Sequence, residues 1–335
     1  MRRAGTMLLL LVVLAPAGAG CRSSAPAGET PLRDVASPEE LDRLAVFSLA
    51  VMSDNKGDGP QADARFARMV RWIADAGDRF VIGLGDHVCA SRANEFPGFI
   101  RADPWWRTHF YPNVADGENE FYGRDQGDWG AGGKIIAAAG LPGRKGVRIR
   151  DNGAEYTAAI KADGYRVHLV QLHYPDTGSA PFRDDSKRYL ADTVGAIEKG
   201  PKDIIIAAAH SRWGFWIDEL SPEQRKVVMS KCDLLLSATT HVFMRKTVAA
   251  HGDGGPLIIN TGSVTFPRGG CPGGYVQVHV VERPLRLVVQ YVDLMRPKRE
   301  LARGKYALVK VIGGKSGPAT FAAPPSDAGT AEPAK

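Results

Sequence analysis

The segment VFSLAVMSDNKGDG, residues 46–59, joins an apolar run typical of a buried strand to an abrupt polar turn. The run ends in Ser53 and Asp54, and the glycines of the turn follow directly. Four later segments end in the same way, because a polar residue able to bind a metal closes each apolar run. These segments are FVIGLGDHVC (80–89), NVADGENEF (113–121), IIIAAAHSRW (204–213) and LLLSATTHVF (234–243).

Predicted strands and helices alternate through the first half of the chain, and the last part is rich in strands. In helix 60–77, Met69, Val70 and Ile73 recur at helical spacing. The other predicted helices are 92–101, 184–198 and 221–232; the predicted strands are 46–53, 80–85, 154–161, 165–173, 203–209, 233–238, 243–250, 256–261, 274–282 and 285–293, and a long loop is expected over 123–153. This order predicts an α/β fold in which two mixed β-sheets face each other and helices cover the outside, a four-layer sandwich.

The N-terminus predicts an export signal. Arg2 and Arg3 precede the apolar stretch 7–15, which is too short to span a bilayer, and small residues then lead to Cys21. Cys21 resembles the lipid-attachment cysteine of bacterial lipoproteins, and cleavage without lipidation is the alternative. The expected location is the periplasm or cell envelope, with a membrane anchor on Cys21.

The remaining chain divides into three predicted parts. These are a linker with a short helix (22–45), the folded domain (46–313) and a disordered, low-complexity tail (314–335), after the signal at 1–21.

Composition is that of an ordinary globular protein of 335 residues, with 44% hydrophobic and 24% charged residues. The net charge is +6, but Lys and Arg are scattered, so no nucleic-acid partner is predicted. If Cys21 carries lipid, Cys89, Cys232 and Cys271 remain. An odd number of cysteines allows at most one disulfide with a thiol left over, which excludes a disulfide scaffold.

The polar strand ends together predict a metal site. Ligands in open α/β sheets bind beyond the carboxyl ends of the strands, where the loops converge. A single Gly-Asp after a strand is usually only a turn, but five such strand ends in one chain are hard to dismiss. Mixed Asp, Asn and His ligation suits one or two divalent ions of Mn, Fe, Zn or Co. The candidates are Asp54, Asp86, Glu118 or Asn119, His210 and His241.

The order of these residues resembles that of the calcineurin-like metallophosphoesterases, including the purple acid phosphatases, over residues 46–294. The family pattern is Asp-x-His, Gly-Asp, Gly-Asn-His-Glu/Asp, a lone His and Gly-His-x-His. The resemblance implies the two-sheet fold, a two-metal site and the hydrolysis of phosphate monoesters or diesters.

Four residues match metal-ligand positions of that family. The resemblance implies that Asp54 binds the first metal and that Asp86, in Gly85-Asp86, is the bridging carboxylate. His210 then binds the second metal and His241 the first.

The third motif, Gly117-Glu118-Asn119-Glu120, departs from the family pattern. Glu118 takes the place of the ligand Asn, and Asn119 takes that of the His that assists the leaving group. A shift of one residue would make Asn119 itself the metal ligand, and both alternatives stay open.

Other family positions are also substituted. Lys56 stands where the first motif has His, and Thr239 replaces a His ligand of the second metal. Cys89 occupies the place of a Tyr ligand in purple acid phosphatases and is a candidate ligand. His87 is either another substitute ligand or a residue of the turn. Arg212, two residues after His210, is a candidate contact for the phosphate of the substrate, and Lys56 is expected to stabilise its charge during catalysis.

Three readings of function follow from these residues. The first is an exported, metal-dependent hydrolase of phosphate esters. The alternative is a degenerate phosphoesterase fold that binds a phosphorylated or envelope ligand without turnover, because Lys56, Asn119 and Thr239 replace family histidines. A structural envelope lipoprotein without metal is the third. The histidines inside strand patterns are predicted to be structural; they are His168, His173 and His279.

Overall fold

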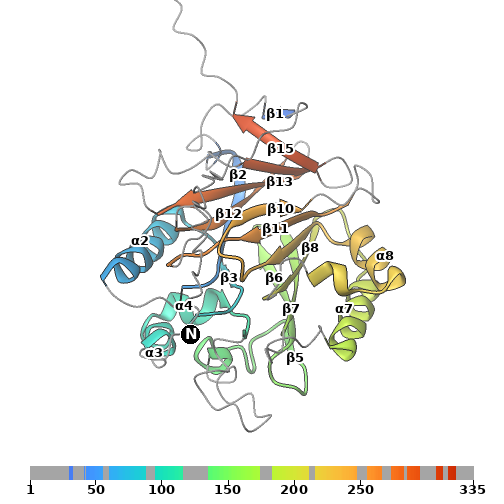
Figure 1. Ribbon diagram of the computed structural model, residues 1–335, viewed down its shortest axis with the longest axis horizontal. Helices are drawn as coiled ribbons and strands as arrows, with labels where there is room; N and C mark the ends of the chain where they lie inside the picture. The colour runs from blue at the N-terminus through green and yellow to red at the C-terminus, as the bar shows by residue number, and fades with distance from the viewer. Residues whose placement is uncertain are drawn as a thin grey trace, which may run out of the picture.

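Two mixed β-sheets face each other in the computed structural model, and helices cover the outside (Figure 1). The predicted fold class is therefore confirmed. The structure describes residues 30–32, 41, 43–55, 60–87, 95–115, 135–173, 183–210, 216–246, 255–265, 273–282, 285–294, 307–311 and 316–321.

The first sheet has eight strands in the order β1-β15-β14-β13-β12-β2-β3-β4. Their bounds are β1 (Thr30–Leu32), β15 (Ser316–Phe321), β14 (Ala307–Val311), β13 (Arg286–Asp293), β12 (Gly274–Val281), β2 (Ala45–Met52), β3 (Val81–Gly83) and β4 (Phe110–Tyr111). The pairs β2–β3 and β3–β4 are parallel, so these three strands end at the same edge.

The second sheet has seven strands in the order β10-β11-β9-β8-β7-β6-β5. Their bounds are β10 (Phe243–Lys246), β11 (Leu257–Thr261), β9 (Leu234–Ser237), β8 (Asp203–Ala209), β7 (Tyr165–Leu172), β6 (Tyr156–Ala162) and β5 (Val147–Ile149). Strands β7, β8, β9 and β11 run parallel to one another, so their carboxyl ends also share one edge.

Helices cover both outer flanks of the two sheets (Figure 1). They are α2 (Pro60–Ala76), α3 (Glu95–Ala102), α4 (Pro104–His109), α7 (Asp184–Ala196), α8 (Pro222–Lys231) and the short η2 (Trp216–Glu219). Helix α8 begins with a capping box in which the Ser221 hydroxyl accepts a hydrogen bond from the Gln224 N–H. Leu190 of α7 and Val228 of α8 pack with Ile205 on the outer face of the second sheet.

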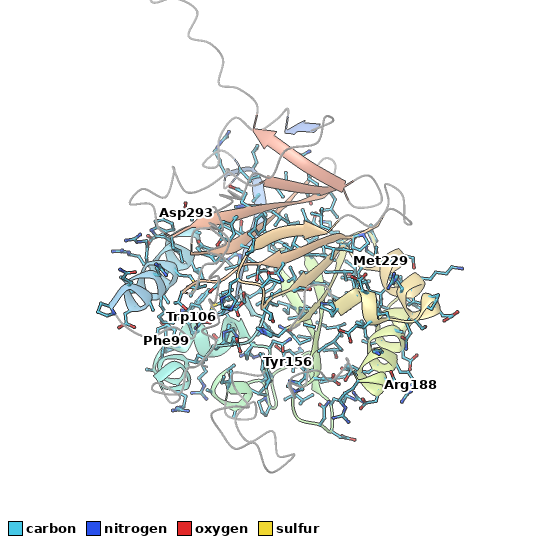
Figure 2. The ribbon with its side chains drawn as sticks, viewed as in Figure 1. Phe99, Trp106, Tyr156, Arg188, Met229 and Asp293 are labelled. Carbon is cyan, nitrogen blue, oxygen red and sulfur yellow. The ribbon has the colours of Figure 1, made fainter. Side chains whose placement is uncertain are left out.

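The main core fills the space between the sheets. The buried strands β2, β3 and β8 are apolar along nearly their whole length, as expected for parallel strands covered on both faces. Trp106 of α4 and Phe99 of α3 close one side of this core with ring centroids 5.4 Å apart (Figure 2). Among the described residues, no helix has the length and apolarity needed to cross a bilayer.

Buried polar side chains join the two sheets below their carboxyl ends. Gln171 of β7 donates from Nε2 to the carbonyl oxygens of Gly83 and Tyr111, each at 3.1 Å. Asn113 donates from Nδ2 to Gln171 Oε1 at 2.8 Å, and the Tyr156 hydroxyl donates to the Pro112 carbonyl at 2.8 Å (Figure 2). We call the line where the ends of β2, β3 and β4 meet those of β7, β8 and β9 the seam.

Three segments differ from the sequence prediction. The predicted disordered tail is wrong for Ser316–Phe321, which form β15, and the predicted linker contains β1. The loop expected over 123–153 contains β5, Val147–Ile149. Each strand is short or interrupted by Gly and Pro, so its period is too brief to separate it from a loop. The cysteines Cys21 and Cys271 and the signal at 1–21 lie outside the described residues.

Replacing Gln171 by Met tests the polar contacts of the seam. Methionine has similar volume but leaves the carbonyls of Gly83 and Tyr111 and the amide of Asn113 without this partner. We expect the free energy of unfolding in urea to fall by about 1–3 kcal/mol. The exposed control Arg188→Met, on α7, should change it by less than about 0.5 kcal/mol. Equal values for the two variants would show that these bonds contribute nothing.

Candidate metal centre

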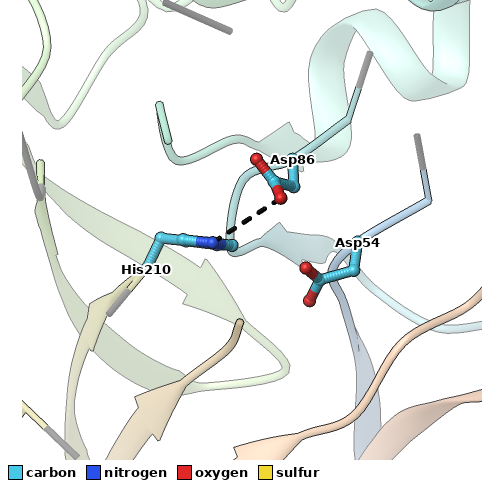
Figure 3. A group of neighbouring side chains, drawn as sticks. All are labelled: Asp54, Asp86 and His210. Atoms are coloured by element: carbon cyan, nitrogen blue, oxygen red, sulfur yellow. Dashed lines mark ion pairs between the residues drawn. The ribbon is translucent and has the colours of Figure 1, made fainter. Parts of the chain in front are cut away.

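Both sheets deliver polar side chains to the seam. Asp54 follows β2 and Asp86 follows β3, two neighbouring parallel strands of the first sheet. His210 follows β8 and His241 follows β9, two neighbouring parallel strands of the second sheet. Figure 3 shows Asp54, Asp86 and His210 pointing toward one another. The topology thus places four of the predicted ligands at one point.

The donor atoms of this group are close together. One ligand atom each from Asp54, Asp86 and His210 lies within 4.8 Å of the others. His210 Nε2 is 3.8 Å from Asp86 Oδ2, and His241 Nε2 is 3.1 Å from Asp54 Oδ1. Two carboxylates and two imidazoles in this arrangement match the donor types that divalent Zn, Fe and Mn accept.

Burial makes a cation the natural complement of these side chains. Asp54 is 0%, Asp86 3% and His210 2% exposed. The buried Asp54 Oδ1 faces His241 Nε2 at 3.1 Å. Buried carboxylates are costly unless a cation or donors offset the loss of water. The residues present therefore fit a divalent metal ion.

Hydrogen bonds fix the orientation of His210. Its Nδ1 lies 2.8 Å from the carbonyl oxygen of Leu84, across the seam in the first sheet. Nδ1 must donate in this bond because a carbonyl oxygen only accepts, so Nε2 is the nitrogen with the lone pair in the neutral ring. Metal-binding histidines commonly use this arrangement, in which a carbonyl oxygen bonded to one ring nitrogen sets the tautomer and leaves the other nitrogen for the metal.

The backbone at the seam is strained. Asp54, Asp86 and His241 have φ values of 49°, 56° and 61°, and Thr239 has 93°. Residues other than glycine rarely adopt positive φ, and for a β-branched residue such as Thr239 it is an outlier. Strain of this kind persists where the surroundings enforce it, and it concentrates at functional sites.

Asp54 is held from several directions. Its carbonyl oxygen accepts hydrogen bonds from the hydroxyls of Ser263 at 2.8 Å and Thr265 at 3.0 Å, in the segment after β11. The Thr239 N–H donates to its Oδ2 at 3.4 Å. Burial alone would raise the pKa of Asp54, but the contact with His241 and the charges of His210 and His241 outweigh it, so the pKa is lowered. The lowered pKa favours the charged carboxylate of Asp54, which is the form expected of a metal ligand.

His87 serves the turn through both of its ring nitrogens. Its Nδ1 lies 2.6 Å from Asn55 Oδ1, and its Nε2 accepts a hydrogen bond from the Gly85 N–H at 3.1 Å. A Cβ on Gly83 would lie 2.5 Å from His87 Nε2, so the ring requires glycine there. Because both ring nitrogens make hydrogen bonds within the turn, His87 is a turn residue, the second of its two predicted roles.

Five predicted site residues lie outside the described residues: Lys56, Cys89, Glu118, Asn119 and Arg212. Their roles remain predictions. Thr239, which stands where the family has a His, lies at the site through its backbone contact with Asp54.

His173 also lies at the seam, and the sequence pattern did not predict it as a residue of the site. It directly follows β7 and is 2% exposed. The signal was the same as at the other strand ends, an apolar run closed by a polar residue.

The structural role predicted for His279 is confirmed, because it lies 2.7 Å from the Ser48 hydroxyl and 3.1 Å from Gln290 Nε2. His168 lies 3.5 Å from Asp203, half-buried on the outer face of the second sheet.

A hollow of about 790 Å³ lies between β5–β7 and α7, and its lining includes Arg148, Arg166 and His168. In β7, His168 alternates with Val167 and Leu169, which belong to the core between the sheets. The hollow is thus on the outer face of the second sheet, and none of its lining residues is a predicted ligand.

Comparison with known proteins gives structural likeness without sequence likeness. No family model matches the chain, and a search of curated proteins finds no match. GAP50, the anchor in the inner membrane complex of Plasmodium, matches with a TM-score of 0.54 at 12% identity, over 80% of this chain and 90% of GAP50.

Two phosphatases also match at lower TM-scores. A dimetal phosphatase from Danio rerio has a TM-score of 0.47 at 11% identity, over 74% of this chain and 96% of its own. A purple acid phosphatase from yellow lupin (Lupinus luteus) seeds has 0.47 at 12% identity, over 82% of this chain and 54% of its own. At these identities, the match to GAP50 shows a shared fold.

His87 predicts that acid destabilises the folded protein. Burial first, and then the charge of His210, lowers the pKa of His87 to about 3, while the charge of Asp54 opposes this. An unfolded histidine has a pKa of about 6.5, so between these values the unfolded state binds a proton that the folded state excludes. This contribution to stability is complete above pH 6.5 and is lost as the pH falls toward 3.

The variant His87→Gln isolates this effect, because its amide oxygen keeps an acceptor for the Gly85 N–H. Between pH 6 and 4, the unfolding free energy of the metal-free wild type should fall more steeply than that of the variant, by up to about 1.4 kcal/mol per pH unit. Unfolding in urea at each pH measures both slopes. If the unfolding free energies of the wild type and the variant fell in parallel with pH, His87 would not be a buried, neutral side chain in the folded protein.

Proposed function

We propose that this protein is a metal-dependent hydrolase of phosphate monoesters or diesters, exported to the bacterial cell envelope. One observation carries the proposal. The buried cluster of Asp54, Asp86 and His210, with His241 beside it, comes from strand ends in the order of the calcineurin-like metallophosphoesterases. The low TM-scores of the phosphatase matches add nothing to this argument, which rests on the cluster itself.

The described residues would hold the metal in a fixed place. When bound, a divalent ion supplies Lewis acidity toward a phosphoryl oxygen and activates water at neutral pH. Asp54 and Asp86 provide negative charge from the first sheet, and His210 and His241 provide imidazole nitrogens from the second. The bonds to Leu84 and Thr239 keep two of these side chains oriented before a substrate arrives, which lowers the cost of reorganisation during the reaction.

The proposed roles of the other predicted residues follow from their chemistry. Lys56 and Arg212 would offset the charge of the phosphate, and Glu118 and Cys89 would add ligands. Asn119 can donate a hydrogen bond to a leaving oxygen but cannot give it a proton. This favours esters with good leaving groups. A lipid on Cys21 would anchor the enzyme to the membrane.

A second candidate function is binding without turnover. Lys56, Asn119 and Thr239 replace family histidines, and the structure with the higher TM-score, GAP50, is an anchor in a membrane complex. In this reading, the cluster would hold a metal or a phosphorylated ligand in the envelope and release no product.

Replacing Asp86 by Ala tests the assignment of the metal centre. Loss of a residue that only orients a metal ligand typically weakens metal binding 10–100-fold, so loss of this carboxylate itself should lower metal affinity and kcat/KM at least about 100-fold. The assay uses p-nitrophenyl phosphate and bis(p-nitrophenyl) phosphate with protein loaded with Mn, Fe or Zn. Asp192→Ala, an exposed carboxylate on α7, is the matched control.

Unchanged activity in the Asp86→Ala variant would contradict the assignment of Asp86 to the metal centre. Metal binding by the wild type without hydrolysis of either ester would favour the binding function.

A further inference from the structure

His173 and His210 occupy equivalent places at adjacent strand ends. Strands β7 and β8 are parallel, and Leu172 pairs with Ala209 at their last residues. His173 and His210 come next, one on each strand. Residues in register on neighbouring parallel strands point to the same face of a sheet. The two imidazoles therefore lie side by side on the face that meets the first sheet.

Both rings are oriented by the same kind of bond across the seam. His173 Nδ1 is 2.8 Å from the carbonyl oxygen of Val114, which follows β4. His210 Nδ1 is 2.8 Å from the carbonyl oxygen of Leu84, which follows β3. Each Nδ1 must donate, so in each ring Nε2 carries the lone pair, as in histidines that bind metals.

The surroundings keep His173 neutral. Burial lowers its pKa to about 4; the bond to Val114 opposes this, and the charges of Arg183 and His210 lower it further. A neutral imidazole is the form that binds metal ions, and it needs no proton release at pH 7.

On the opposite side of His210, one family imidazole position is occupied by Thr239, while His241 further along the same segment contacts Asp54. Strand β9 neighbours β8 there, and Thr239 beyond β9 stands where the family pattern has a His. The Thr239 hydroxyl oxygen is buried and has no hydrogen-bond partner in the described part of the chain. A threonine hydroxyl is a poor substitute for imidazole toward Zn, Fe or Mn.

We propose that His173 is a further ligand of the metal centre and supplies, from β7, the imidazole that Thr239 does not supply beyond β9. The proposal rests on the metal centre of the proposed function. It extends the donor set beyond the compact group of Asp54, Asp86 and His210 along the second sheet toward β7. The imidazole ligand absent at Thr239, beyond β9, would thus be replaced by that of His173, beyond β7. His210, beyond β8, lies between the two positions.

The variant His173→Asn separates ligation from structure. The Asn amide can donate to the Val114 carbonyl as Nδ1 does, but it has no group at the position of Nε2. We expect the metal-free variant to unfold at the wild-type temperature and to bind Zn²⁺ at least about 10-fold more weakly. Competition with a chromophoric chelator measures the affinity of the full-length chain. His168→Asn, on the outer face of the same strand, is the control and should bind Zn²⁺ as the wild type does.

The outcomes separate the two proposals. Wild-type Zn²⁺ affinity in the His173→Asn variant would overturn the role of His173 and leave the metal centre in place. A wild type that binds no Zn²⁺, Mn²⁺ or Fe²⁺ would overturn both.

A second measurement keeps the proposal testable if the variant does not fold. Imidazole ¹⁵N spectra of the wild type, assigned through the backbone, report each ring nitrogen directly. Adding Zn²⁺ should shift the Nε2 resonance of His173 together with that of His210, while His168 and His279 stay unchanged. An unmoved His173 resonance beside a shifted His210 resonance would overturn the proposal.

Discussion

The burial of two carboxylates beside each other is the constraint on which the rest of this structure depends. Asp54 and Asp86 are 0% and 3% exposed, and atoms of both lie within 4.8 Å of a ligand atom of His210. Removing a carboxylate from water costs several kcal/mol after relaxation, and two like charges in one place add to that cost. A divalent cation offsets both the lost hydration and the repulsion between the carboxylates. Binding of a metal at the seam should therefore also stabilise the fold there.

Rigid surroundings make this arrangement possible. The φ values of 49° at Asp54 and 56° at Asp86 are unfavourable by themselves. The strands behind them are paired on both sides within the first sheet, and Asn113 and Gln171 join that sheet to the second one. A sheet edge held in this way cannot relax the two turns, and the ligands stay oriented without a bound ion. This preorganisation is what metal-assisted hydrolysis requires of its scaffold.

The sequence predicted what depends on local pattern. Apolar runs closed by Asp54, Asp86, His210 or His241 gave both the strands and the candidate ligands, because a strand end is a local signal. Gln171 could not be found in this way, since its partners are carbonyl groups 60 and 88 residues away. His173 was predicted to be a structural residue of strand 165–173, and only the pairing of β7 with β8 places it beside His210. The strands β1 and β15 depend on long-range pairing with each other, which no local period reveals.

The most direct test of this account is the anomalous scattering of a crystal of the Zn²⁺-loaded protein, recorded on both sides of the zinc absorption edge. The account predicts an anomalous peak at the seam, about 2.0–2.2 Å from carboxylate oxygens of Asp54 and Asp86 and from His210 Nε2. A fully loaded crystal with no peak between these residues, or with its zinc bound only elsewhere on the protein, would contradict it.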